Sequence, residues 1–146
     1  MVSLQKLEIE LQELFKQKQY SKIIFEITSQ TEDEERSSSL CNLLGLSRIS
    51  NDNKNKDSLS MALRDFKQGY LKEKNTNHAI DCLANFITSS VLLMDLEKDY
   101  KFDFSEIINF YESTEKFCIN HRPTNLAMAM VYRRLNDAKK LILHFK

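Results

Sequence analysis

The chain has 146 residues and a mass of 17.2 kDa, the size of one domain or of a short run of repeats. Its 21 basic and 21 acidic side chains cancel, so it lacks the excess of Lys and Arg that favours binding to nucleic acid or to an anionic membrane surface. Only two Gly and one Pro are present, too few for the tight turns of an all-β domain, and we expect an all-α fold.

Apolar residues recur at helical spacing along nearly the whole chain. Turn-forming residues at 51–56 separate two such stretches, and Leu135-Asn136-Asp137 is expected to end another. The acidic run 32–35 is typical of a solvated turn or helix end. The apolar stripes of the eight predicted helices cover residues 4–15, 23–27, 40–49, 59–70, 77–94, 107–117, 126–132 and 138–145.

The sequence carries no targeting signal that we recognise. The N-terminus alternates apolar and charged residues, unlike a signal peptide, and the longest apolar run, 91–94, is far short of the roughly 20 residues that a membrane span needs. Cys41, Cys82 and Cys118 are widely spaced and form no CxxC pair, so we expect packed thiols and no zinc or redox site. These features favour a cytoplasmic location and no membrane partner.

A repeat emerges when the chain is divided into units of about 34 residues counted from Leu4. Small or apolar residues then occupy the eighth position of four successive units, which is where two antiparallel helices would need to approach closely. The second unit needs about five extra residues and the third about eleven, which loops tolerate. The eighth positions are Leu11, Gly45, Ala84 and Ala129.

This pattern resembles the tetratricopeptide repeat (TPR) family. Leu44-Gly45-x-x-Arg48, followed by Ala62-x-x-x-Phe66-x-x-Gly69, is similar to the family's LGxxY…AxxxFxxA motif. The resemblance implies a single domain over 1–146, an α-solenoid of about four antiparallel helix pairs, two with longer insertions between their helices. The implied repeats are 4–37, 38–76, 77–121 and an incomplete 122–146. The large aromatic that the family places early in each unit is replaced by Leu7, Cys41, Ile80 and Asn125. An irregular helical bundle of unrelated pairs is the alternative.

The resemblance also implies a concave groove lined by the first helix of each pair. Asn42 and Asn85 fall at groove positions, and their amides can both donate to and accept from an extended peptide backbone. Arg133 is suited to a carboxylate. We therefore expect a protein or peptide partner. The groove candidates are Gln12, Asn42, Leu46, His78, Asp81, Asn85, Met130 and Arg133, flanked by Glu8, Phe15, Ser39, Ile49, Thr88 and Leu126.

Nothing in the sequence indicates catalysis, a metal or a cofactor. The motifs HExxH, GxSxG, GxGxxG and GxxxxGK[ST] are absent, and the three His residues fall on different repeats or at their edges. Cys118 lies three residues before His121, but the helix is predicted to end between them, ahead of Pro123. We expect a packed cysteine beside a surface histidine rather than a nucleophile and its base.

The C-terminal residues Leu141, Ile142 and Phe145 place apolar side chains on more than one helical face, which is typical of an interface. A continuation of the chain, a second copy and another protein remain alternatives for what covers them. Leu40–Gly45 is also similar to the N-terminal TPR segments of marine-bacterial sulfotransferases, glycosyltransferases and methyltransferases. The main expectation is a binding scaffold. A substrate-positioning segment of a larger transferase is the alternative, followed by a helical bundle with a small-molecule cavity.

Overall fold

The structure, a computed structural model, describes residues 4–52, 55–73, 76–97 and 100–144, with side chains up to residue 137. In these ranges the chain forms helices only, so the predicted all-α class is confirmed. The elements are α1 (Leu4–Lys16), α2 (Tyr20–Gln30), the 3-10 helix η1 (Asp33–Glu35), α3 (Ser38–Asn51), α4 (Lys56–Lys72), α5 (Asn77–Leu96), α6 (Phe104–Cys118) and α7 (Arg122–His144).

Side-chain caps fix where four of these helices begin, because each cap accepts a hydrogen bond from an otherwise unpaired backbone N–H of the first turn. Ser37 Oγ accepts from the Leu40 N–H at 3.1 Å at the start of α3. The other three caps are Asn55 at α4, Thr76 at α5 and Asp103 at α6. Polar residues between the apolar stripes therefore determine the helix boundaries as much as the stripes do.

The predicted break at residues 135–137 is wrong. α7 runs without interruption from Arg122 to His144, so residues 138–144 continue it rather than form an eighth helix. Asn136 and Asp137 are poor helix formers, but each costs well under 1 kcal/mol inside a helix, unlike Pro. In the turn just before them, Arg134 Nη2 donates to Asp95 Oδ2 of α5 at 2.9 Å, which ties this part of α7 to the core helix.

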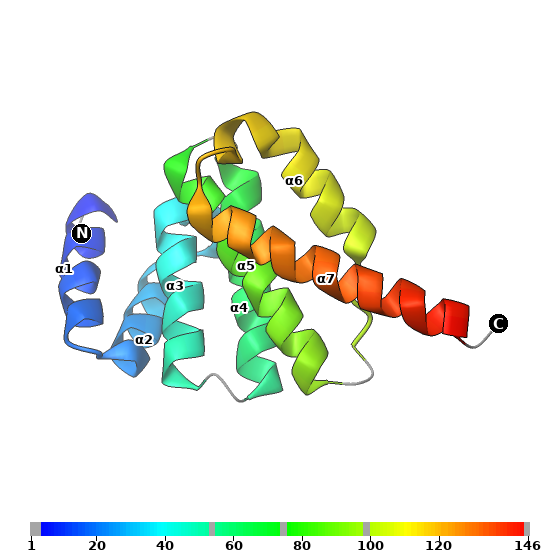
Figure 1. Cartoon of the computed structure of the whole chain (residues 1–146). Coiled ribbons are helices and arrows are strands. Elements are labelled where there is room, and N and C mark those ends of the chain that lie inside the picture. Colours follow the sequence, from blue (N-terminus) through cyan, green and yellow to red (C-terminus); the bar gives the residue numbers. More distant parts are fainter. Residues whose placement is uncertain (1–3, 53–54, 74–75, 98–99, 145–146) are drawn as a thin grey trace.

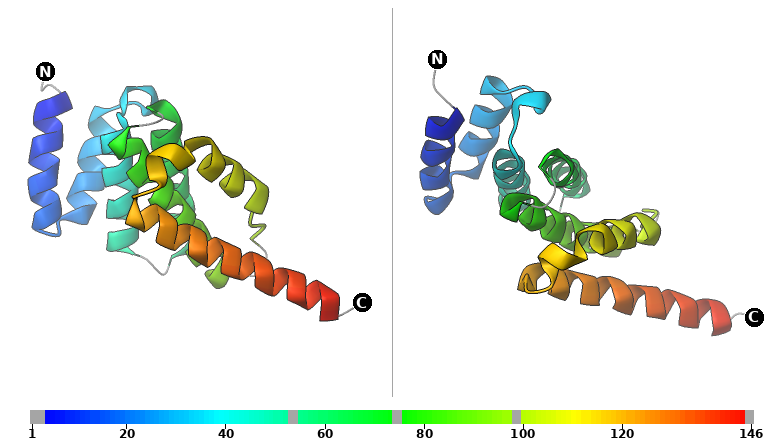
Figure 2. Two further views of the ribbon diagram at one scale, coloured as in Figure 1. Left: turned by 45° about the horizontal axis from the view of Figure 1, so that its top comes forward. Right: turned by 90° about the horizontal axis from the view of Figure 1, so that it is seen from above.

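Each helix packs against the next along the chain, and the odd-numbered helices also contact one another in the order α1, α3, α5, α7. In Figure 1, α1 and the C-terminal end of α7 lie at opposite ends of the molecule, and α5 runs through its centre. The two views of Figure 2 show the last turns of α7 extending beyond the other helices. The described helices therefore pack mainly against neighbours in the chain order.

The buried apolar residues form two clusters. The smaller joins α1, α2 and α3 around Leu11, Ile23 and Leu44, and the larger joins α4 to α7 around Phe66 and Ile87. α3 belongs to the first cluster through its buried leucines and contacts the second through half-buried residues further along the helix. α3 is thus the element that connects the two halves of the core.

Two glycines allow α3, α4 and α5 to approach one another. A Cβ at Gly45 would lie 2.5 Å from the ring of Phe66, which is fully buried on α4. A Cβ at Gly69 would lie 2.6 Å from Cys82 Sγ on α5 and 2.8 Å from Cys41 Cβ on α3. The close approach expected at Gly45 is therefore present. Ala129, at the same repeat position in the last unit, is exposed instead.

By length and composition, α5 is the one described helix that could cross a membrane, although its longest apolar run has only four residues. It carries two charged side chains, Asp81 and Asp95, near its two ends. Within the fold, 61% of its most apolar stretch is buried among the other helices, which is the position of a core helix.

Candidate functional site

A cavity of about 350 Å³ opens where α1, α3 and α5 meet. Its walls bring together four groove positions from three helices that are far apart in the sequence, Glu8 and Gln12 of α1, Ser39 of α3 and His78 of α5. Ser37 Oγ donates to Glu8 Oε1 at 2.7 Å, which holds that carboxylate at the α3 end of the cavity. The polar groups that remain are amides, a hydroxyl and an imidazole. The lining residues are Gln5, Glu8, Ile9, Gln12, Ser39 and His78.

The sequence interpretation missed two lining residues, Gln5 and Ile9. Ile9 is 72% exposed, whereas Leu7 and Leu11 on the same helix are buried. The signal was present in the sequence, because Ile9 lies off the stripe of Leu4, Leu7, Leu11 and Leu14 and so cannot face the core with them. Because Ile9 also lines the cavity, it is a candidate contact for a ligand or partner.

Asn42 and Asn85 lie side by side, as groove residues on neighbouring helices should, but they bond to each other. The Asn85 Nδ2 donates to Asn42 Oδ1 at 2.7 Å, and both side chains are half-buried. Each amide has one remaining polar end, because an amide carries both a donor and an acceptor. The pair therefore joins α3 to α5 and still offers one donor and one acceptor to a ligand.

Asp81 is engaged by His121, which precedes α7. His121 Nε2 lies 2.9 Å from Asp81 Oδ1, and Nδ1 lies 2.6 Å from Thr124 Oγ1. The backbone N–H of Thr124 also lies against Nδ1, at an N–N distance of 3.3 Å. The hydroxyl of Thr124 is fully buried, so no substrate can reach it. These three residues fix the start of α7 against α5. Asp81 and His121 are 40 residues apart, so a search for short sequence motifs does not find the pair.

The cysteines are buried and form no disulfide. Burial raises the pKa of Cys41 to about 11 and also raises the pKa of Cys82, so both remain protonated thiols at neutral pH. Cys118 is fully buried and its Sγ lies 3.7 Å from Thr114 Oγ1, while His121 bonds to Asp81. α6 ends at Cys118, and the two residues do not form a nucleophile–base pair.

The remaining groove candidates lie outside the lining of this cavity. Leu46 is half-buried against the larger core cluster. Met130 is half-buried and Arg133 is exposed on α7, with Leu126 four residues before Met130 and 56% exposed. For the predicted C-terminal interface, the side chains of Leu141 and Ile142, and all of Phe145, lie outside the described residues.

A second, smaller cavity of about 140 Å³ contains a charge network. Arg48 Nε donates to Asp65 Oδ2 at 2.6 Å, and Asp33 accepts from both Arg36 and Arg64. Burial raises the pKa of Asp65 to about 6, against the lowering effect of Arg48. These bonds connect η1, α3 and α4. The repeat motif did not predict them, because it has a Tyr at the position of Arg48.

Among the described residues, no group of three or more His, Cys, Asp or Glu side chains is placed to hold a metal ion. The chain matches no protein-family model, no curated protein and no solved structure. The side chains that line the cavity at α1, α3 and α5 are therefore the main basis for a functional assignment.

Proposed function

We propose that the chain is a protein-interaction module, an α-solenoid of TPR-like helix pairs that binds a peptide segment of a partner protein. The supporting observation is the cavity at α1, α3 and α5, where groove positions from three helices line one space. No catalytic step is assigned to the chain, and its binding role requires none.

The chemistry of the lining favours an extended peptide. Gln12 and His78 each offer groups that hydrogen-bond peptide N–H and C=O, and Ser39 adds a hydroxyl. Ile9, exposed at the rim, supplies apolar contact for one side chain of the peptide. The Asn42–Asn85 pair lies further along the same two helices, α3 and α5, and retains one free donor and one free acceptor.

The test begins with peptides selected from a random displayed library against the full chain. We expect the double substitution Gln12→Ala with His78→Ala to lower the affinity of the selected peptides by about tenfold or more, because two hydrogen bonds of roughly 1 kcal/mol each are lost. Both side chains are exposed, so the melting temperature should hardly change.

The matched control is Glu112→Ala with Lys116→Ala, two exposed positions on α6. Peptides that bind all three proteins equally well, or a selection that enriches no peptide at all, would contradict the proposed function.

A further inference from the structure

The cavity at α1, α3 and α5 carries a charge as well as hydrogen-bonding groups. Of its six lining side chains, Glu8 is the one that is charged at neutral pH when His78 is counted as neutral. Glu8 is half-buried, and Gln12 lies one helical turn further along the same face of α1. The cavity therefore contains one negative charge in a chain whose total charge is zero.

A hydrogen bond holds the Glu8 carboxylate in place. Ser37 Oγ accepts from the backbone N–H of Leu40 at 3.1 Å and donates its own proton to Glu8 Oε1 at 2.7 Å. This bond uses one carboxylate oxygen, and a carboxylate accepts hydrogen bonds at both. Because Glu8 is already positioned, pairing with a cation costs less side-chain entropy than it would for a fully exposed carboxylate.

The N-terminal ends of α3 and α5 also reach the cavity, because Ser39 and His78 are the second residues of these helices. A helix N-terminus carries a partial positive charge of about half a unit, spread over its unpaired N–H groups. Ser37 caps one of these groups in α3 and Thr76 caps one in α5. The partial charges stabilise the Glu8 carboxylate, but the full charge in the lining is negative. The group that complements it is a cation.

The groove positions around the cavity are neutral or acidic. Among the groove candidates on α1, α3 and α5, the second charged residue is Asp81, which is one turn after His78 and has a side chain 46% exposed. The one Lys or Arg among all the groove candidates is Arg133, on α7. A basic segment is therefore attracted to the α1, α3 and α5 part of the groove, and an acidic segment is repelled.

We propose, on the basis of the peptide-binding function above, that the bound peptide carries a lysine or arginine whose charged end pairs with the Glu8 carboxylate. The aliphatic stem of that side chain lies on Ile9, which lines the same cavity and is 72% exposed. Gln12, Ser39 and His78 bond the peptide backbone beside it. The groove thus selects a basic segment of a partner protein.

The test carries out the peptide selection with the full chain and with its Glu8→Gln variant. The Gln amide still accepts the Ser37 hydrogen bond, so the melting temperature should hardly change. Peptides selected by the unsubstituted chain should share a Lys or Arg at one position, and those selected by Glu8→Gln should not. Replacing that residue by Met in the best peptide should lower its affinity for the unsubstituted chain by about fivefold to tenfold in fluorescence anisotropy. The same replacement should hardly change its affinity for Glu8→Gln.

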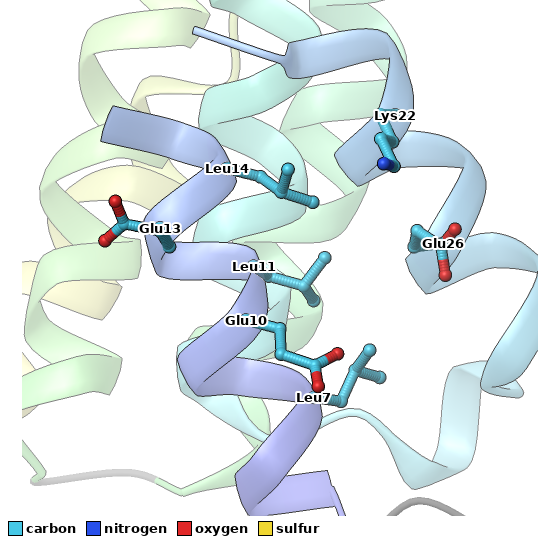
Figure 3. Close-up of a pocket in the computed structure, with 7 residues that line it drawn as sticks. All are labelled: Leu7, Glu10, Leu11, Glu13, Leu14, Lys22 and Glu26. Atoms are coloured by element: carbon cyan, nitrogen blue, oxygen red, sulfur yellow. The ribbon is translucent and has the colours of Figure 1, made fainter. Parts of the chain in front are cut away.

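The matched control is Glu10→Gln, which removes one carboxylate from an exposed position of the same helix. Glu10 lines the opening between α1 and α2 drawn in Figure 3 rather than the cavity, so its loss should leave the selected peptides and their affinities unchanged. Equal effects of the two Glu→Gln substitutions would mean unspecific attraction and overturn the proposal.

The selection also separates this proposal from the peptide-binding function on which it rests. Selected peptides that share no basic residue, or that share an acidic one, would overturn the pairing with Glu8 and leave peptide binding standing. A selection that enriches no peptide would overturn both.

Discussion

Arg48 and Asp65 form the most buried ion pair among the described residues, with side chains 12% and 7% exposed. Their Nε–Oδ2 distance is 2.6 Å. Burial raises the pKa of Asp65 to about 6, and Arg48 is the strongest of the charges that oppose this rise. Because the pKa is higher in the folded than in the unfolded chain, the contribution of Asp65 to stability falls as the pH rises from about 4 to about 6.

Removing the guanidinium should make stability depend on pH over a wider range. In Arg48→Met the pKa of Asp65 rises further, because the neighbouring positive charge is gone. At pH 8 the buried Asp65 carboxylate is then ionised without a partner, which lowers the free energy of unfolding most. Near pH 5 the carboxyl group is protonated, and this penalty is largely removed. We expect a loss of about 3 kcal/mol at pH 8 and a clearly smaller loss at pH 5, measured by urea unfolding at both pH values. Arg64→Met removes only an exposed pair with Asp33 and should cost under about 1 kcal/mol at either pH. Equal losses for Arg48→Met at both pH values would contradict this account.

At the scale of single elements, the local sequence predicted where the helices lie. It predicted less well where each helix ends and which side chains it contacts. Apolar periodicity located each of the seven described α-helices, because a buried helical face requires it, but not the short 3-10 helix η1. The end of α7 was missed because Asn136 and Asp137 are common in turns, yet a helix tolerates them when no Gly or Pro is present.

Only part of the candidate site was predictable, because the repeat phase places residues on faces of a helix but does not indicate which residues they bond to. The Asn42–Asn85 and Asp81–His121 bonds join residues 43 and 40 positions apart, which no spacing rule within one helix can detect.

The α3–α4 contact provides a test of helix pairing. Gly45→Ala improves helix propensity by about 1 kcal/mol, but the new Cβ would lie 2.5 Å from the enclosed Phe66 ring. We expect the clash to dominate, with a net loss of about 1–3 kcal/mol in the free energy of unfolding. Phe66→Leu should cost less in the Gly45→Ala background than in the wild type, with a coupling of about 1 kcal/mol in the double-mutant cycle. A Gly45→Ala variant as stable as the wild type would show that the two helices do not pack this closely.

At the scale of the whole molecule, the two core clusters predict uneven stability. α1 and α2 contact the rest of the chain through the small cluster that they share with α3 and through two hydrogen bonds, Ser37–Glu8 and Ser21–Asn51. An opening of about 400 Å³ separates part of the facing surfaces of α1 and α2. α4 and α5 belong to the larger cluster, which reaches as far as α7. A chain in which each helix contacts mainly its neighbours can open from one end without losing the rest.

Hydrogen exchange followed by mass spectrometry should therefore show faster exchange in α1 and α2 than in α3, α4 and α5. Ile23→Ala and Ile87→Ala are matched variants, because both side chains are fully buried and each truncation costs about 2–5 kcal/mol. Ile23 lies in the small cluster, so its truncation should speed exchange in α1 and α2 and leave α4 and α5 protected. Ile87 lies in the larger cluster, and its truncation should speed exchange throughout the chain, since α1 and α2 lose their support when α3 opens. If both variants speed exchange equally everywhere, the chain unfolds as one unit, and a progression of semi-independent helix pairs does not describe its energetics.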